Sequence, residues 1–326
     1  MNSRQRFNAV MRYSPADRVP YFEEEIREEV IQAWRGQGLP PGADLSQMFS
    51  LDRHEHLEPD LDPLPEPASW PASVAELDDF KQFLNPDDPA RFPAHWSRCV
   101  RLWRFRKHPL MLRVHHGLFL ALGVDGWHRF TEVIRLLALD PRFVRRAMDM
   151  QAEFTARLAE KTLRVVDVDA AVVTEPICDM HGPLISPRMY EEYALRSYVP
   201  LLEVLARHRV ATIVFRTFAN ARLLLPGVLK RGFNCLWASE VYQEAMDYRE
   251  LRREFGRDLR LIGGIDLNSL RRGKEAIRRE ILEKAPALLE QGGYIPMADG
   301  RIREDVPYEN YVYYRRLLEQ VTQSGV

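Results

Sequence analysis

The stretch LRLIGGIDLNSLRRGKEAIRREILEKAPALLEQGGYIPM, residues 259–297, contains two short apolar runs separated by a long charged segment. The runs Leu259–Ile262 and Tyr294–Met297 have the length of strands, and each has a glycine next to one end. Residues 267–291, between them, alternate charged and apolar residues at helical spacing. A strand, a helix and a second strand in this order predict a crossover unit with two parallel strands.

The same alternation extends over most of the chain. Eight apolar runs with helical segments after them predict a closed barrel with outer helices, and we expect a single-domain α/β fold, a (β/α)8 TIM barrel over residues 1–326. An open doubly wound sheet is the alternative, although no GxGxxG follows an early strand. The six other runs are Val19–Glu23, Arg53–Leu57, Leu110–Val114, Ala170–Thr174, Ala211–Phe215 and Phe233–Trp237.

One irregular stretch interrupts this pattern. Residues 58–71, EPDLDPLPEPASWP, contain five prolines, which fix φ and remove backbone donors. The flanking segments show no change in composition, so we expect a long loop inside the domain and not an interdomain linker.

Composition bounds the partners and the compartment. The chain has 326 residues and a formal net charge of −1, so it has no general attraction to nucleic acid or to an anionic membrane, and we expect neither as a partner. The sequence has no apolar run long enough to span a membrane and no signal-peptide core at its N-terminus. Its three cysteines, Cys99, Cys178 and Cys235, form no CxxC pair. These features predict a cytoplasmic protein with free thiols.

Four segments resemble the uroporphyrinogen decarboxylase superfamily, which also contains corrinoid-dependent methyltransferases. The resemblance runs nearly from end to end, and it implies a barrel that is often a homodimer. The segments are SRQRFNAVMRYSPADRVPYFEE (3–24), GPLISPRMYEEYALRSYVPLLEVL (182–205), LIGGIDLNSLRRGKEAIRREI (261–281) and GGYIPMADGRIREDVPYENYVYYRRLL (292–318).

Two departures from the family pattern place this chain nearer the methyltransferases, but without their zinc. The true decarboxylases carry an arginine-rich RQAGRY motif after the first strand, where this chain has the acidic YFEEEIREE (21–29). The zinc methyltransferases carry His-x-Cys after the fifth strand and a cysteine after the eighth. Here those places read Arg216-Thr217-Phe218 and Met297-Ala298-Asp299-Gly300, which lack the usual nitrogen and sulfur ligands. We therefore expect no bound metal.

Barrel enzymes place their chemistry at the carboxyl ends of the strands, and polar residues at those positions are the candidate site. We predict catalytic roles for Glu175, His115 and Asp299, and expect Glu175, Arg216, Glu240 and Asp299 to surround one mouth. Arg216 offers a planar fork for a carboxylate or phosphate. Each candidate also has a structural interpretation, as a helix cap, a core histidine or an internal ion pair. The residues predicted to bind substrate are Glu23, Glu25, His116, Asp179, His181, Arg216, Asn220, Glu240 and Asp266.

The resemblance leaves three functions open. The first is a zinc-free methyltransferase that moves a methyl group between a small methylated substrate, or tetrahydrofolate, and a corrinoid held on a partner protein. The second is a decarboxylase acting on a tetrapyrrole or a related acid, with Arg216 as the carboxylate anchor. The third is a barrel that binds a small molecule without catalysis.

Overall fold

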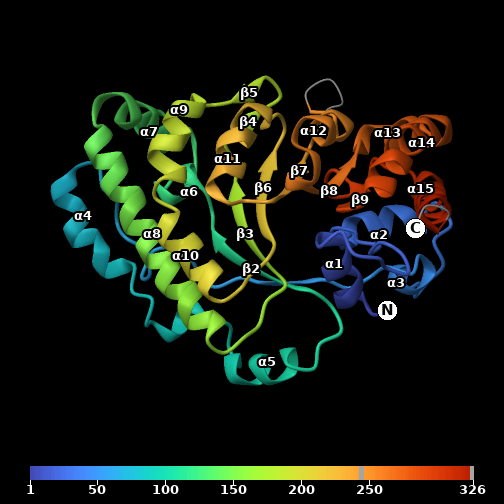
Figure 1. Ribbon diagram of the computed structural model, residues 1–326, viewed down its shortest axis with the longest axis horizontal. Coiled ribbons are helices and arrows are strands. Elements are labelled where there is room, and N and C mark those ends of the chain that lie inside the picture. Colours follow the sequence, from blue (N-terminus) through green and yellow to red (C-terminus); the bar gives the residue numbers. More distant parts are fainter. Residues whose placement is uncertain (242–245, 324–326) are drawn as a thin grey trace.

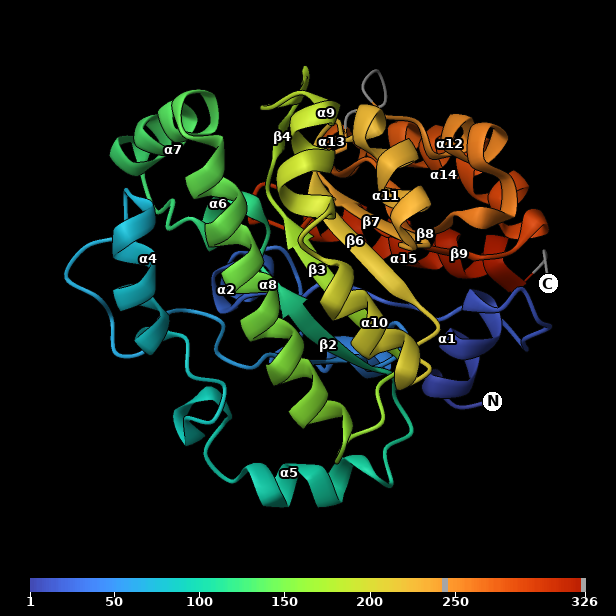
Figure 2. The ribbon, with the colours of Figure 1, turned by 60° about the vertical axis from the view of Figure 1, so that its left-hand side comes forward.

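In the computed structural model, which describes residues 1–241 and 246–323, seven parallel strands form one curled sheet with helices outside it (Figures 1 and 2). The strand order is β1-β2-β3-β6-β7-β8-β9, which follows the chain. The alternation of strands and helices is thus confirmed as an α/β fold. The strands are β1 (Glu55–Leu57), β2 (Leu110–His115), β3 (Ala170–Glu175), β6 (Ile213–Phe218), β7 (Cys235–Ser239), β8 (Arg260–Ile265) and β9 (Tyr294–Ala298).

The helices flank this sheet, and a short antiparallel pair, β4 (Cys178–Asp179) and β5 (Gly182–Pro183), follows β3. The helices are α1 (Ser3–Met11), α2 (Glu28–Arg35), α3 (Leu45–Met48), α4 (Val74–Phe80), α5 (Trp96–Trp103), α6 (Leu118–Ala121), α7 (Trp127–Leu139), α8 (Pro141–Leu163), α9 (Pro187–Tyr190), α10 (Val199–Arg207), α11 (Leu225–Arg231), α12 (Tyr248–Phe255), α13 (Leu267–Arg272), α14 (Lys274–Gln291) and α15 (Tyr308–Gln323). In the described part of the chain, no helix has the length and apolar character to cross a membrane.

The expected first strand, Val19–Glu23, is wrong as a strand assignment, although the segment is extended and buried. One backbone hydrogen bond links it to the approach to β1, from Asp52 N to Tyr21 O at 2.9 Å. Pro20 has no N–H, and Tyr21 N donates to the Asp52 carboxylate at 2.9 Å instead of to a neighbouring strand. The segment therefore lies beside the sheet without forming a ladder.

The two central strands begin and end later in the chain than the apolar runs predict. β6 and β7 pair from Val214 with Cys235 through Phe218 with Ser239, so the ladder continues over Arg216 and Thr217. Because the pairing extends beyond the apolar residues, the polar side chains of Arg216 and Thr217 lie at the carboxyl end of the sheet.

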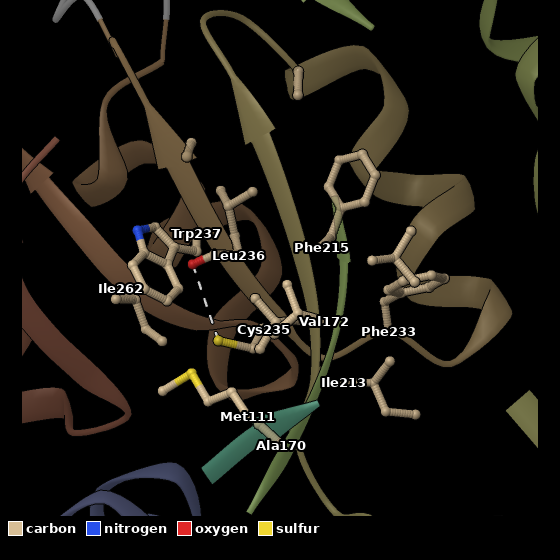
Figure 3. Packing of buried hydrophobic residues seen from close by; sticks show 14 of the residues in the cluster. Met111, Ala170, Val172, Ile213, Phe215, Phe233, Cys235, Leu236, Trp237 and Ile262 are labelled. Carbon is tan, nitrogen blue, oxygen red and sulfur yellow. Dashed lines mark hydrogen bonds between the residues drawn. The ribbon is translucent and has the colours of Figure 1, made fainter. Parts of the chain in front are cut away.

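Alternation along the strands divides the core into two layers, as Figure 3 shows for β6 and β7. Phe215 and Phe233 point to the side of the outer helices, with their rings 6.0 Å apart. Cys235 and Trp237, two residues apart on β7, point to the opposite, inner side of the curl. Figure 3 also places Met111 on this inner side.

The proline-rich stretch is a long loop, as predicted. Arg91 is buried beside it and donates from Nη2 to the carbonyl of Phe83 at 2.7 Å, while its Nη1 donates to the carbonyls of Asp60 and Asp62. A buried guanidinium supplies the donors that this loop lacks.

Candidate functional site

A cavity of about 970 Å³ lies on the inner side of the curled sheet. Arg216 of β6 and Trp237 of β7 form part of its wall, and Glu58 after β1 and Arg301 after β9 also line it. The remaining lining comes mainly from the acidic segment that follows Phe22 and from residues 43–56. The cavity therefore reaches the carboxyl ends of strands, where parallel α/β proteins bind ligands.

Arg216 and Trp237 are brought together by the strand register. They are direct partners on β6 and β7, and side chains of paired residues point to the same side of a sheet. The guanidinium carbon lies 4.6 Å from the centre of the indole ring, and Nη2 donates to Glu24 Oε1 at 2.9 Å. Arg216 Nε is buried without a partner among the described residues. The indole and Glu24 together hold the guanidinium in place.

Two histidines beside Trp237 were not among the predicted site residues. His54 and His56 are two positions apart, so they share one face, and their rings lie 6.3 and 5.8 Å from that of Trp237. Burial, together with the positive charge of Arg216, lowers the pKa of His54 to about 3 and that of His56 to about 4. Both imidazoles are therefore neutral at physiological pH.

The two histidines differ in how well the protein satisfies them. His54 has a hydrogen bond with the backbone of Asp52, whereas no residue in 1–241 or 246–323 hydrogen-bonds to the His56 ring. His56 is partly exposed to the cavity. A neutral imidazole with both nitrogens free can donate one hydrogen bond and accept another from a bound molecule. The signal that would have found the pair is His-x-His at strand spacing.

Glu23 lines the cavity from a buried position. Its Oε2 lies 3.5 Å from Arg315 and accepts from the Tyr311 hydroxyl at 3.4 Å, while Oε1 has no partner in the described chain. Burial outweighs Arg315 and raises the pKa of Glu23 to about 7. Glu23 can therefore hold a proton near neutral pH. Glu25 lines the same cavity and is exposed.

Glu175 lies on the opposite side of the sheet from this cavity. Thr174 is the register partner of Arg216, so Glu175, one residue later, points toward the outer helices. Its Oε1 accepts from Leu118 N at 2.8 Å, and its Oε2 accepts from the hydroxyls of Tyr190 at 3.0 Å and Tyr198 at 2.9 Å. Burial raises the pKa of Glu175 to about 7.

The two histidines at the end of β2, His115 and His116, point in different directions. A register shift between Arg113 and His115 turns His115 to the outer side, where its ring lies 4.7 Å from that of Tyr198. His115 Nδ1 accepts from Gly117 N at 2.9 Å, and its Nε2 is buried without a partner in the described chain. His116 lies instead with Nδ1 3.6 Å from an Asp62 carboxylate oxygen.

Asp299 joins the loops that follow three strands. Its Oδ1 accepts from Leu267 N at 2.9 Å and its Oδ2 from Val241 N at 2.7 Å, and burial raises its pKa to about 7. Glu240 is exposed and pairs with Arg303 at 3.2 Å. Of the four residues expected around one mouth, Arg216 alone lines the cavity, so that expectation is wrong. Glu175 points to the outer side of the sheet, Asp299 is bonded to backbone N–H groups of two loops, and Glu240 is exposed and paired with Arg303.

Four further candidates, Asp179, His181, Asn220 and Asp266, lie in local turns or at the start of helices. Asp266 begins α13 and accepts from Asn268 N at 2.8 Å. Asp179 Oδ1 accepts from the backbone of His181 at 2.8 Å, which closes the β4–β5 turn, and Asn220 Oδ1 accepts from Arg222 N at 3.3 Å. None of these residues lines the cavity, and a role in binding stays a prediction for each.

Among the described residues, no group of three or more histidine, cysteine or carboxylate side chains is arranged to hold a metal ion. Asp299 is the only zinc-type donor in the two family positions, and backbone N–H groups occupy both its oxygens. We expect elemental analysis of protein purified without chelator to give well below one zinc per chain. Stoichiometric zinc would contradict this, and the loop from Glu175 to His181 would then be the first place to search.

The fold and the cavity define an α/β protein with a polar cavity on the inner side of a curled parallel sheet. The chain belongs to the uroporphyrinogen decarboxylase family, because the family model described as "Uroporphyrinogen decarboxylase (URO-D)" matches residues 121–318. A solved structure named as a methyltransferase from Methanosarcina mazei is similar, with a TM-score of 0.60 and 13% identity, over 98% of this chain and 99% of that one. At this identity the likeness concerns the fold. No curated protein matches the sequence.

Proposed function

We propose that this protein is a zinc-free methyltransferase, which moves a methyl group between a small methylated substrate, or tetrahydrofolate, and a corrinoid carried by a partner protein. Family membership and the methyltransferase name of the similar structure support this class of reaction. The observation that carries the proposal is the charge state of the cavity, where neutral imidazoles and a proton-holding carboxyl face a guanidinium that is already paired.

The same charge state disfavours a substrate with many carboxylates. Of the three arginines that line the cavity, Arg216 is paired with Glu24 and Arg53 with Glu55, which leaves Arg301. A polyanion would also meet Glu25 and Glu58, and repulsion at intermediate dielectric costs on the order of a few kcal/mol. A small substrate that is neutral, cationic or singly acidic fits better.

The proposed chemistry divides between three side chains. A reduced corrinoid, when bound, supplies the nucleophile that accepts the methyl group. The atom that loses the methyl group keeps the bonding electron pair and takes a proton from Glu23. His56 donates a neutral N–H to the negative charge that develops on that atom, and Arg216 orients any acid group of the substrate.

We also infer that the extended segment 19–23 completes the sheet as an eighth member and closes the barrel. The backbone bond from Asp52 N to Tyr21 O supports its place beside β1. Arg315 of α15, the helix that follows β9, donates to Phe22 O at 3.3 Å, which ties the same segment to the last part of the fold. Closure would shield the cavity floor from water.

Decarboxylation is the second candidate, because Arg216 and Arg301 offer anchors for a substrate with one or two carboxylates. Parallel anaerobic assays separate the two. One incubates the protein with uroporphyrinogen and follows the oxidised products by chromatography. The other follows the visible spectrum of a reduced corrinoid with methylated amines, methyl ethers and methyl-tetrahydrofolate. Coproporphyrin formed at an enzymatic rate would reverse the order of the candidates.

The proposed proton donor predicts a pH dependence. Because the pKa of Glu23 is raised to about 7, kcat/KM should be full below that value and should fall about tenfold per pH unit above it. Glu23→Gln should lower the rate and abolish this limb, whereas Glu29→Gln, an exposed residue of α2, should retain it. A limb that persists unchanged in Glu23→Gln would assign the proton to another group.

A further inference from the structure

Helix α5 lies at the edge of the molecule, at the amino end of the strands and opposite the ends that reach the cavity (Figures 1 and 2). The segment that contains it, FPAHWSRCVRLWRFRKH (92–108), has five arginine and lysine residues and no acidic one. This asymmetry is hidden in the net charge of −1 for the whole chain. A strongly positive segment in a near-neutral protein indicates a local anionic partner.

One face of α5 is fixed to the protein. Trp103 is buried, its Nε1 donates to Glu55 at 2.9 Å, and its ring lies 5.6 Å from that of Trp96. The other face is free of the fold and carries apolar side chains, with Leu102 62% exposed and Phe105, just after the helix, 85% exposed. Two large apolar side chains this exposed, three residues apart, form a candidate contact surface.

The cations around these apolar side chains have no carboxylate partners. Arg98, Arg101, Arg104 and Lys107 are exposed and form no ion pair within residues 1–241 and 246–323. Arg106 is the exception, since it pairs with Asp169 at 3.0 Å. Unpaired arginines that flank an exposed leucine and phenylalanine make the surface both cationic and apolar.

A recess of about 270 Å³ lies beside this surface, between α5 and the end of α8. Four arginines line it, Arg4, Arg104, Arg106 and Arg164, together with Val165, which is 45% exposed. Asp169 pairs with both Arg4 and Arg106, Glu160 pairs with Arg164 at 3.1 Å, and Asp167 also lines the recess, so Arg104 is the one lining arginine without an ion pair among the described residues. The unpaired guanidinium of Arg104 at the edge of this recess suits a phosphate group.

We propose that the surface formed by Leu102, Phe105, Val165 and the surrounding arginines docks on an anionic lipid bilayer. Lipid phosphates would contact the recess and the unpaired cations, while Leu102 and Phe105 enter the boundary between headgroups and acyl chains. The exposed apolar pair favours a bilayer over nucleic acid, which would leave Leu102 without an apolar partner. Docking at the amino end leaves the cavity accessible, so this proposal is independent of the proposed function.

Sedimentation with vesicles tests the proposal on the full chain. Vesicles of phosphatidylcholine alone are compared with vesicles containing phosphatidylglycerol, at low and high salt. We expect binding to the anionic vesicles only, and about a tenfold or larger loss in Arg101→Gln/Arg104→Gln and in Leu102→Ser/Phe105→Ser. Matched controls are Arg278→Gln/Arg279→Gln on α14 and Leu139→Ser/Leu223→Ser, which change exposed residues elsewhere and should bind as the wild type does.

Several outcomes would overturn the proposal. Equal binding to neutral vesicles would show that the arginines do not contribute to binding. Equal losses of binding in the control variants would show a general effect of surface charge or of exposed apolar side chains. Binding to single-stranded RNA or to polyglutamate, with none to anionic vesicles, would assign the surface to another class of partner. Unchanged thermal unfolding of each variant verifies that the fold is retained, because every substituted side chain is exposed.

Discussion

Replacing Glu175 with alanine is expected to lower the free energy of unfolding by about 3–5 kcal/mol, although Glu175 does not line the cavity. The change leaves Leu118 N and the hydroxyls of Tyr190 and Tyr198 without their acceptor, in a site that is fully buried. It also leaves a void where the buried Glu175 side chain was packed against its neighbours. Unsatisfied buried donors and a new void both act in the same direction.

Equilibrium unfolding in urea, followed by circular dichroism, measures this effect. Glu175→Gln keeps the shape and one acceptor oxygen, so it should cost about 1–2 kcal/mol. Glu153→Ala, which changes an exposed glutamate of α8, should remain within about 0.5 kcal/mol of the wild type. A stable Glu175→Ala variant that has lost activity would restore the catalytic role predicted from the sequence.

Replacing His56 with alanine is expected to lower kcat for methyl transfer by about 100- to 1,000-fold, with a smaller change in KM. His56 faces the cavity without a hydrogen-bond partner in the described chain, so its loss leaves no protein group unsatisfied. Its neutral N–H would interact most strongly with the charge that develops in the transition state, and this is the reason that kcat should change more than KM.

Two further variants sharpen the interpretation of His56. His56→Asn retains a neutral N–H donor and should recover part of the rate, whereas His128→Ala, an exposed histidine of α7, should leave it unchanged. If His56→Ala raised KM and left kcat unchanged, His56 would bind the substrate without stabilising the transition state.

The sequence predicts the parallel sheet well because its strands are compact apolar runs. β2, β3, β8 and β9 coincide closely with the runs at Leu110, Ala170, Leu259 and Tyr294. β6 and β7 begin two residues later than their runs, and the segment from Val19 forms no strand, since Pro20 has no N–H and Tyr21 N donates to the Asp52 carboxylate. An apolar run indicates a buried extended segment, but its partners decide whether it becomes a strand.

The site was harder to predict because the face of each side chain depends on register. One position separates Thr174, which pairs with Arg216, from Glu175, which points away, and nothing in the run of apolar residues decides between them. The register shift after Arg113 reverses the expectation for His115 in the same way. Arg216 was found because its place in the family pattern fixes it at a strand end.

His54 and His56 escaped prediction for a different reason. β1 is three residues long, so it gives little apolar signal. Both rings lie beside Trp237, and the charge of Arg216 lowers their pKa values, yet these two residues are distant in sequence. The His-x-His spacing places both rings on one face, but only the placement of the strands shows that Trp237 and Arg216 lie beside them.

The most direct measurement is methyl transfer to a reduced corrinoid, with the wild type, His56→Ala, His128→Ala and His181→Ala compared under the same anaerobic conditions. His128, an exposed histidine of α7 that does not line the cavity, serves as the matched control, and His181→Ala tests the binding role predicted for the β4–β5 turn. We expect a spectral change with at least one methylated amine, methyl ether or methyl-tetrahydrofolate, its loss in His56→Ala and its survival in His128→Ala. Transfer that survives in His56→Ala would contradict a role of His56 in the reaction, and its disappearance in His181→Ala would move the active site to the outer loop.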